Sequence, residues 1–325
     1  MHQVSCLVTC YNERPFIGAA IESVLAQSAA DQIMEILVVD DGSTDGSGDL
    51  LDQLASTDTR LRIFHIDNGG ISRARNYGLH QAHAPLVALL DGDDLWHRDK
   101  LARQLSVVDQ ADEAIALWYS DYVDFSGNPD SGSKVAVRAF SQSDTDTLER
   151  YFVGDGPILP STVILSMPAL QNAGLFDESV RLFEEMDLWL RLAAAGYRFQ
   201  HVPGALTFKR QRSGSLSSDT TRWESAFEAI GDQWANRCPQ LRPLVQQRRA
   251  YRLAKIAQQY FLAGKDREAW PYLWRSLTLF PGNRRSYLYG LLALFPYPVR
   301  SLMTRGAKAL RAQVLIEARP RRAAQ

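Results

Sequence analysis

Short apolar runs alternate with amphipathic stretches in the first hundred residues, and this alternation constrains the fold more than any other feature of the chain. Four apolar runs predict buried strands, at residues 4–9, 35–40, 61–66 and 86–90. Three stretches between them predict helices, at 17–29, 47–56 and 71–82. Alternating strands and helices build a mostly parallel α/β sheet with helices on both faces.

The remaining chain predicts more of this sheet and then a helical region. Residues 113–124 and 161–165 read as strands, 185–195 as a helix and 197–202 as a strand, with a Gly-, Ser- and Asp-rich loop over 125–146. From residue 221 onward the pattern is helical. Residues 250–281 resemble one tetratricopeptide-type hairpin, although ordinary helix packing explains the same spacing.

Polar loops follow the predicted strands, where open α/β sheets bind their ligands. Asp40 and Asp41 end the second run, and such carboxylates accept hydrogen bonds from a base or a ribose. The alternative is helix capping by the 43–45 segment, which accounts for those residues but not for the two carboxylates before them.

Three carboxylates follow the fourth apolar run, at Asp91, Asp93 and Asp94. Clustered carboxylates repel one another, and a divalent cation relieves this repulsion. Mg²⁺ and Mn²⁺ favour one or two carboxylates together with substrate phosphate oxygens, so the loop predicts a metal–diphosphate site. The alternative is a solvated turn that caps the helix beginning near His97.

Two further segments carry charge at predicted helix starts. Arg73 and Arg75 follow a Gly-rich turn whose free N–H groups attract anions, which suits a diphosphate, although such arginines are often merely solvated. Glu184, Glu185 and Asp187 begin a later helix, where the helix dipole also favours acidic residues. The functional interpretation is a general base that deprotonates an incoming hydroxyl.

These loops, in this order, resemble the family 2 inverting glycosyltransferases with the GT-A fold. The similarity covers about residues 3–218. It rests on five stretches: VSCLVTCYNE (4–13), VVDDGSTD (38–45), NGGISRARNYG (68–78), LDGDDLW (90–96) and GLFDESVRLFEEMDLWLRL (174–192).

The resemblance implies roles for individual residues. Thr9, Tyr11, Glu13, Asp40 and Asp41 would hold the nucleobase side of a nucleotide-sugar donor. Arg73 or Arg75 would approach the diphosphate. Asp93 would lie on the ribose or the metal, and Asp94 or Asp91 would ligate Mn²⁺ or Mg²⁺.

The chain departs from the family pattern at two positions. Glu185 stands where the family has its catalytic Asp, which keeps the carboxylate but leaves Glu184 as a rival base. Arg212 stands where the family commonly has a His. Arg cannot ligate a metal but can clamp phosphate.

The expected reaction is inverting transfer of a sugar from a nucleoside diphosphate sugar, a UDP-sugar, to an acceptor hydroxyl in bacterial surface polysaccharide biosynthesis. The expected partners are that donor and a carbohydrate or lipid-linked acceptor, and no nucleic acid. The alternatives are a nucleotidyltransferase, whose Gly-, Arg- and Lys-rich first loop is missing here, and an inactive sugar-nucleotide-binding protein. Residues 1–218 would form the catalytic domain, with a donor half at 1–100 and an acceptor half at 101–218, and residues 219–325 a helical appendage.

Cysteine use and charge suggest where such a protein works. The cysteines have no disulfide or metal-ligand spacing, and we expect Cys6 and Cys10 to be buried thiols in a reducing cytoplasm. Neither a signal peptide nor an apolar run of about 18 residues is expected. Residues 282–325 carry nine basic residues and one acidic residue, Glu317, which predicts a basic amphipathic tail on an anionic membrane. The alternative is that the tail packs on the protein and its cations stay solvated.

Overall fold

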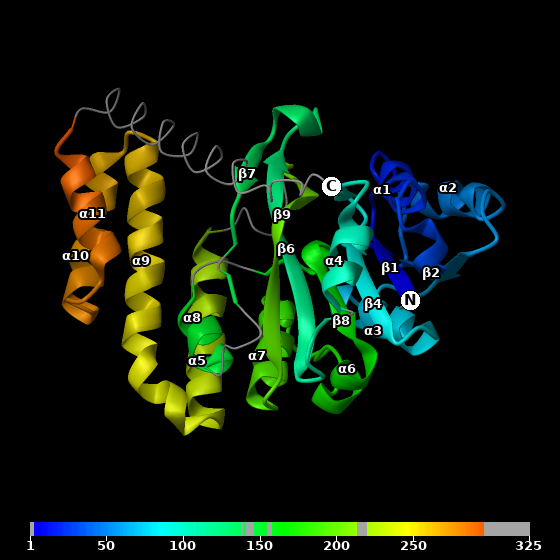
Figure 1. The fold of residues 1–325 in the computed structure, drawn as a ribbon. Helices are drawn as coiled ribbons and strands as arrows, with labels where there is room; N and C mark the ends of the chain where they lie inside the picture. Colours follow the sequence, from blue (N-terminus) through cyan, green and yellow to red (C-terminus); the bar gives the residue numbers. More distant parts are fainter. Residues whose placement is uncertain are drawn as a thin grey trace, which may run out of the picture. The chain divides into compact units, whose positions relative to one another are not determined.

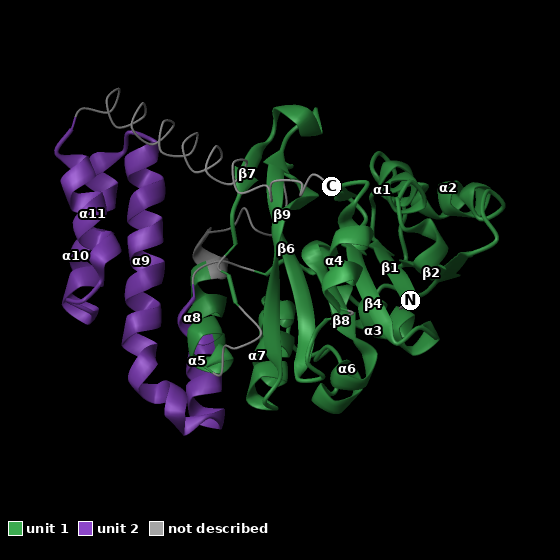
Figure 2. Cartoon of the chain, in the orientation of Figure 1, with its two compact units in different colours: residues 1–151, 156–230 green, residues 152–155, 231–325 purple. Residues whose placement is uncertain are grey.

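The structure is a computed structural model that describes residues 3–108, 110–137, 139–140, 146–154, 158–212 and 220–295. The chain forms two compact units (Figure 2). Unit 1 comprises Met1–Tyr151 and Gly156–Ile230, and unit 2 comprises Phe152–Asp155 and Gly231–Gln325. The boundary therefore falls inside helix α8 (Thr220–Arg237).

The first half of unit 1 is the α/β sheet that the sequence predicts (Figure 1). Its parallel strands are β1 (Val4–Cys10), β2 (Ile33–Asp40), β3 (Leu61–His65) and β4 (Leu86–Asp91), in the order β3-β2-β1-β4. Helices α1 (Ile17–Leu25), α2 (Ser47–Leu54) and α3 (Ile71–Gln81) connect them. The predicted fold class is confirmed.

The second half extends this sheet with mixed pairing. Its elements are β5 (Leu95–Trp96), α4 (Lys100–Val108), β6 (Ile115–Phe125), β7 (Ser133–Val135), α5 (Thr147–Val153), β8 (Val163–Ser166), α6 (Met167–Ala173), α7 (Glu184–Ala194) and β9 (Arg198–Arg210). Within the described ranges, β8 pairs antiparallel with β4 and β6, and β9 runs parallel to β6 and antiparallel to β5.

Strand β9 is longer than the sequence predicts, because it continues through Pro203 and Gly204 to Arg210. These residues normally interrupt a strand. Here Gly204 takes a φ of +121°, and the pairing with β6 shifts register between Ser120 and Tyr122. The irregularity lets the strand carry Arg210 to the edge of the sheet where the predicted site lies.

The core of unit 1 follows from the alternating side chains of its central strands. Cys6 and Val8 of β1 belong to one buried apolar cluster with residues of α1, α2 and α4. Leu7 points to the opposite face, where it lies against Gly78 of α3 so closely that a Cβ there would overlap it. Helices therefore cover both faces, and the expectation that Cys6 and Cys10 are buried free thiols is confirmed.

Unit 2 is helical. After the last turns of α8 it contains α9 (Val245–Leu262), α10 (Asp266–Leu279) and α11 (Arg284–Ala293). Helices α9 and α10 form the expected hairpin around a turn at Gly264, which has a φ of +73°. A small cluster joins the two helices, made of Ala257, Phe261, Ala269 and Leu273.

Of the two expectations about membranes, the described residues test the one that concerns membrane-spanning helices. Among the helices in the described ranges, none has both the length and the apolar character needed to cross a bilayer. The predicted amphipathic tail lies mostly at residues 296–325, outside the described residues.

Candidate active site

The polar loops that follow the parallel strands lie at one edge of the sheet. Thr9 of β1 pairs with Asp91 of β4, Cys10 pairs with Asp40 of β2, and Asp40 pairs with His65 of β3. Since these register partners are the last residues of their strands, or in the case of Thr9 the last but one, the loops after them begin side by side. The convergence predicted from the sequence is therefore present.

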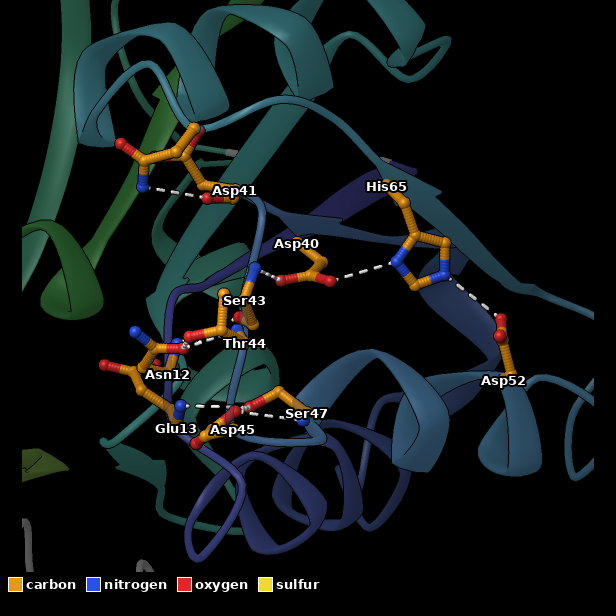
Figure 3. Close-up of polar contacts among 11 residues, drawn as sticks. Asn12, Glu13, Asp40, Asp41, Ser43, Thr44, Asp45, Ser47, Asp52 and His65 are labelled. Carbon is orange, nitrogen blue, oxygen red and sulfur yellow. Dashed lines mark hydrogen bonds and ion pairs between the residues drawn. The ribbon is translucent and has the colours of Figure 1, made fainter.

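The loops after β1 and β2 are joined by hydrogen bonds (Figure 3). The Asn12 N–H donates to Ser43 Oγ at 2.9 Å, and the Thr44 N–H donates to Asn12 Oδ1 at 2.7 Å. The Glu13 N–H donates to Ser47 Oγ at 3.0 Å. Asp45 Oδ1 accepts from the N–H of Ser47, the first residue of α2, but the N-cap position itself is occupied by Gly46. These contacts fix the carbonyl and amide groups around the predicted nucleobase pocket.

Asp40 and Asp41 are buried, and their carboxylates hold neighbouring loops. Asp40 accepts from the Ser43 N–H at 3.0 Å and contacts His65 Nδ1 at 3.0 Å (Figure 3). Asp41 accepts from the N–H groups of Gly69 and Gly70, both at 2.8 Å. Sequence reasoning did not anticipate this role, and their contact with a nucleobase stays a prediction.

Two further residues that are predicted to hold the nucleobase, Tyr11 and Thr9, lie at the end of β1. Tyr11 is 49% exposed, which suits a ring that packs against a base. Thr9 Oγ1 is buried and has no hydrogen-bond partner among the described residues. A buried hydroxyl without a partner is unusual and is satisfied when a ligand supplies one.

An acidic cluster forms where the loops after β1 and β4 meet. It contains Glu13, Asp91, Asp93 and Asp94. Burial raises the pKa of Glu13 to about 9, and the nearby Asp93 adds to this effect. Burial, followed by repulsion from Asp91, also raises the pKa of Asp93. Arg212 pairs with both groups, at 3.0 Å from Glu13 Oε1 and 2.9 Å from Asp93 Oδ2.

The cluster fits a metal through Asp91 and Asp93 better than through Asp94. Asp94 is 4% exposed and accepts a 2.9 Å hydrogen bond from the Arg210 N–H, so it fixes the loop instead of facing a ligand. The side chains of Asp91 and Asp93 are 33% and 16% exposed. No three His, Cys, Asp or Glu side chains of the described residues lie close enough together to hold an ion by themselves. One or two carboxylates plus phosphate oxygens remain a sufficient shell for Mg²⁺ or Mn²⁺.

Arg75 lies in a different place from the one expected. Its guanidinium is buried and donates to Asp91 Oδ1 at 2.8 Å and to Glu184 Oε1 at 2.9 Å. Its charge also lies 5.1 Å from the centre of the Phe176 ring. Arg75 thus connects the acidic loop to helix α7, and the exposed Arg73 is the freer candidate for a diphosphate.

Helix α7 presents three carboxylates with distinct environments. Asp187 is fully buried and pairs with Arg191 at 2.8 Å, which makes it structural. Glu184 pairs with Arg75. Burial raises the pKa of the half-buried Glu185 to about 8, and the adjacent Glu184 reinforces the shift. A carboxyl group with a pKa near the working pH is suited to general acid–base chemistry.

Two residues that sequence reasoning missed support these loops. Ser161 Oγ accepts from the Asp91 N–H at 3.1 Å, and its carbonyl accepts from Trp96 Nε1 and from Thr207 Oγ1. The Arg210 guanidinium lies 4.6 Å from the ring centres of both Phe16 and Phe125. Their partners are distant in sequence, so no local signal identifies them.

Comparison with known proteins shows which families and folds this chain is similar to. The family model described as "Glycosyl transferase family 2" matches residues 5–154. The putative teichuronic acid biosynthesis glycosyltransferase TuaG of Bacillus subtilis is 28% identical over 69% of this chain and 84% of its own length. The succinoglycan biosynthesis protein ExoO of Rhizobium meliloti is 32% identical over 66% of this chain and 62% of its own length. Other curated relatives are longer, and the chain matches 30% and 26% of the length of two of them.

Solved structures share the fold at low sequence identity. S. aureus TarS 1-349 in complex with UDP-GlcNAc has a TM-score of 0.56 at 20% identity, over 72% of this chain and 67% of TarS 1-349. The mannosyltransferase PcManGT from Pyrobaculum calidifontis, in complex with GDP-Man and Mn²⁺, has a TM-score of 0.56 at 20% identity, over 96% of this chain and 86% of its own. These similarities show a GT-A-like fold, and residues 5–154 of the chain match the glycosyl transferase family 2 model.

Proposed function

We propose that this protein transfers a sugar from a nucleoside diphosphate sugar to an acceptor hydroxyl with inversion, and that Glu185 is the general base. The observation that carries the proposal is the raised pKa of Glu185, about 8, at the edge of a site built from strand-end loops. An ordinary surface carboxyl group would be a much weaker base at neutral pH. Glu184 is held by Arg75 and positions the start of α7.

The reaction follows from these placements. Glu185 takes the proton of the acceptor hydroxyl as its oxygen attacks the anomeric carbon from the face opposite the diphosphate. The bond to the diphosphate oxygen breaks through an oxocarbenium-like transition state. Arg73 and Arg212 are the cations available to the departing diphosphate. A divalent metal, bound beside Asp93 and Asp91, would add Lewis-acid stabilisation of the same negative charge.

The donor proposed is a UDP-sugar, with the base beside Tyr11 and Thr9 and the diphosphate toward Asp93. TarS, bound to UDP-GlcNAc, and PcManGT, bound to GDP-Man and Mn²⁺, support a nucleotide-sugar donor and the use of Mn²⁺ or Mg²⁺. The names of TuaG and ExoO support a carbohydrate or lipid-linked acceptor in bacterial surface polysaccharide biosynthesis. Residues 1–218 are proposed as the catalytic domain.

The test compares three variants of the full chain. Wild type should be stabilised by a UDP-sugar with Mn²⁺ in a thermal-shift screen. Glu185→Gln should lower the turnover rate by about 10²–10⁴-fold and leave the donor Kd nearly unchanged. Glu22→Gln, which changes an exposed carboxylate on α1, is the matched control and should behave as wild type.

The other outcomes are equally informative. Loss of turnover in Glu184→Gln but not in Glu185→Gln would transfer the role of base to Glu184. Donor binding without transfer or hydrolysis by wild type, across acceptors, would favour an inactive sugar-nucleotide-binding protein. No nucleotide-sugar binding at all would refute the proposal.

We also propose that unit 2 contacts an anionic membrane surface from the cytoplasmic side. Helix α11 and the residue pair after it carry an exposed apolar stripe, made of Tyr287, Leu288, Leu291, Leu294 and Phe295. Each of these side chains is at least 45% exposed, and the exposed Arg284 and Arg285 begin the same helix. An apolar stripe beside cations is typical of helices that lie in a membrane interface. The net charge of +8 over residues 282–325, nine basic minus one acidic, favours a bilayer over a second copy of the stripe.

Vesicle co-sedimentation tests this contact. Wild type should bind vesicles containing phosphatidylglycerol at low salt, and the double variant Leu291→Asn/Leu294→Asn should bind them several-fold more weakly. Leu262→Asn, at a leucine on α9 that is 39% exposed and lies outside the stripe, is the control. If the double variant binds vesicles as wild type does, or instead changes the oligomeric state, the stripe does not dock on membranes.

A further inference from the structure

Arg212 connects the two loops that line the predicted diphosphate end of the site. Its Nη2 lies 3.0 Å from Glu13 Oε1, and its Nε lies 2.9 Å from Asp93 Oδ2. Glu13 belongs to the loop after β1, and Asp93 belongs to the loop after β4. One guanidinium therefore contacts two carboxyl groups that come from different loops.

These two carboxylates need a cation because they have few other partners. The Glu13 side chain is 9% exposed, and its Oε2 has no hydrogen-bond partner among the described residues. Gly92 allows the approach, since a Cβ at this position would overlap the Glu13 carboxylate and the Thr9 carbonyl oxygen. A buried carboxylate that faces a second carboxylate is strongly unfavourable without a positive charge between them.

The nearby Arg210, the last residue of β9, is not free to serve in the same way. The Arg210 guanidinium lies against Phe16 and Phe125, and its Nε donates to the Asp93 carbonyl oxygen. The backbone N–H of Arg210 donates to Asp94 Oδ1. Arg210 is thus part of the framework. The Arg212 side chain is 36% exposed, contacts the two carboxylates and lies 6.0 Å from the centre of the Phe16 ring.

We propose that Arg212 is a counter-ion of the donor site that changes partners when the donor binds, from the carboxylates to the diphosphate. In the nucleotide-free protein it occupies the cation position between Glu13 and Asp93. When a nucleoside diphosphate binds, the guanidinium turns to the diphosphate oxygens as a planar fork, and Asp93 would then be free to hold a divalent cation. The inference deepens the proposed function and rests on it, since it requires a nucleoside diphosphate at this edge of the sheet.

The proposal predicts effects of opposite sign on two ligands. A guanidinium and a metal ion compete for the same Asp93 carboxylate, so removing Arg212 should tighten the binding of Mn²⁺ alone. The diphosphate loses a charged hydrogen-bonding partner in the same variant, so the binding of UDP should weaken. A merely structural salt bridge would not produce opposite changes.

The experiment uses the full chain and two probes, Mn²⁺ alone and UDP with saturating Mn²⁺. Mn²⁺ binding is followed by the electron paramagnetic resonance signal of the free ion, and UDP binding by calorimetry. Arg212→Gln should bind Mn²⁺ about 5-fold more tightly, as expected for loss of a partly exposed competing ion pair. The same variant should bind UDP about 10-fold more weakly. Arg212→Lys should bind Mn²⁺ as wild type does but should not recover full UDP affinity.

The matched control is Lys209→Gln, which removes one positive charge from the same end of β9 and should change both affinities by less than about twofold. Unchanged or weaker Mn²⁺ binding by Arg212→Gln would overturn the inference, as would unchanged UDP binding, while wild type still binds UDP. If wild type itself binds no UDP with Mn²⁺, the proposed function fails and the inference fails with it.

Discussion

Glu185 should make activity depend on pH in a range where ordinary carboxyl groups do not titrate. Burial and the adjacent Glu184 raise its pKa from 4.5 to about 8. At pH 7 about one tenth of the molecules then carry the ionised base, and at pH 6 about one hundredth. We therefore expect kcat/KM to rise about tenfold per pH unit up to about pH 8 and to level off above it, since kcat/KM reports the free enzyme.

The same pKa shift has a consequence for stability, with a definite sign. Between pH 4.5 and about 8 the folded protein binds a proton at Glu185 that the unfolded chain has released, so this group's contribution to stability falls as pH rises through that range. The full difference of 3.5 pKa units corresponds to about 5 kcal/mol. Because Glu185 is only half-buried, solvent screening reduces the expected effect to about 1–3 kcal/mol.

Glu185→Gln should therefore lose activity and gain stability together. Its free energy of unfolding should exceed that of wild type at pH 9 but not at pH 4.5, as followed by urea denaturation at several pH values. Transfer rates at donor concentrations below KM supply the activity profile. The reasoning is refuted by a wild-type profile that is flat from pH 6 to 9, together with a Gln variant whose stability advantage is the same at both pH values.

Three further substitutions test other parts of the site and its framework. Lys100 is fully buried, and burial lowers its pKa to about 7. The free energy of unfolding of the wild type should therefore rise between pH 7 and 10.5. Lys100→Met should raise the Tm at pH 7 by several degrees in a calorimetric scan. Arg75→Met leaves two carboxylates without their buried cation and should cost about 3–5 kcal/mol in urea denaturation, part of which Glu184→Gln in the same chain should restore. Gly92→Ala places a methyl group against the Glu13 carboxylate and should weaken UDP binding about tenfold in calorimetry, without unfolding the protein.

The elements predicted from local pattern agree with the structure where burial is uniform along the chain. The run 86–90 is apolar at every position, and the strand it predicts lies between β1 and β8 with both faces covered. The end of β9 could not be predicted in the same way. Its continuation past Pro203 depends on pairing with β6, which is about 80 residues earlier in the chain, and on a register shift that has no local signature.

The candidate site shows a similar division between residue type and residue partner. The sequence identifies Asp91 and Arg75 as charged residues at the correct edge of the sheet. It does not reveal that the buried Arg75 guanidinium binds both Asp91 and Glu184, which is 109 positions after Arg75. It also suggests a metal ligand at Asp94, which stays a prediction, but not that the Asp94 carboxylate accepts from the backbone of Arg210. Such pairings are set by tertiary packing, so the residue types at a site can be predicted before their partners.

The balance of charge at the site explains why its arginines come from separate segments. The carboxylates Glu13, Asp91, Asp93, Asp94, Glu184 and Glu185 gather there, against the guanidinium groups of Arg75, Arg210 and Arg212. Six carboxylates minus three guanidinium groups leave an excess of three negative charges if every group is ionised, and the raised pKa values of Glu13, Asp94 and Glu185 reflect that excess together with burial. A donor diphosphate adds negative charge to the same region, so it can bind tightly only if cations or protons accompany it. A site of this composition therefore favours donor binding together with a cation, and the proposed movement of Arg212 from Asp93 to the diphosphate is one way to supply that cation.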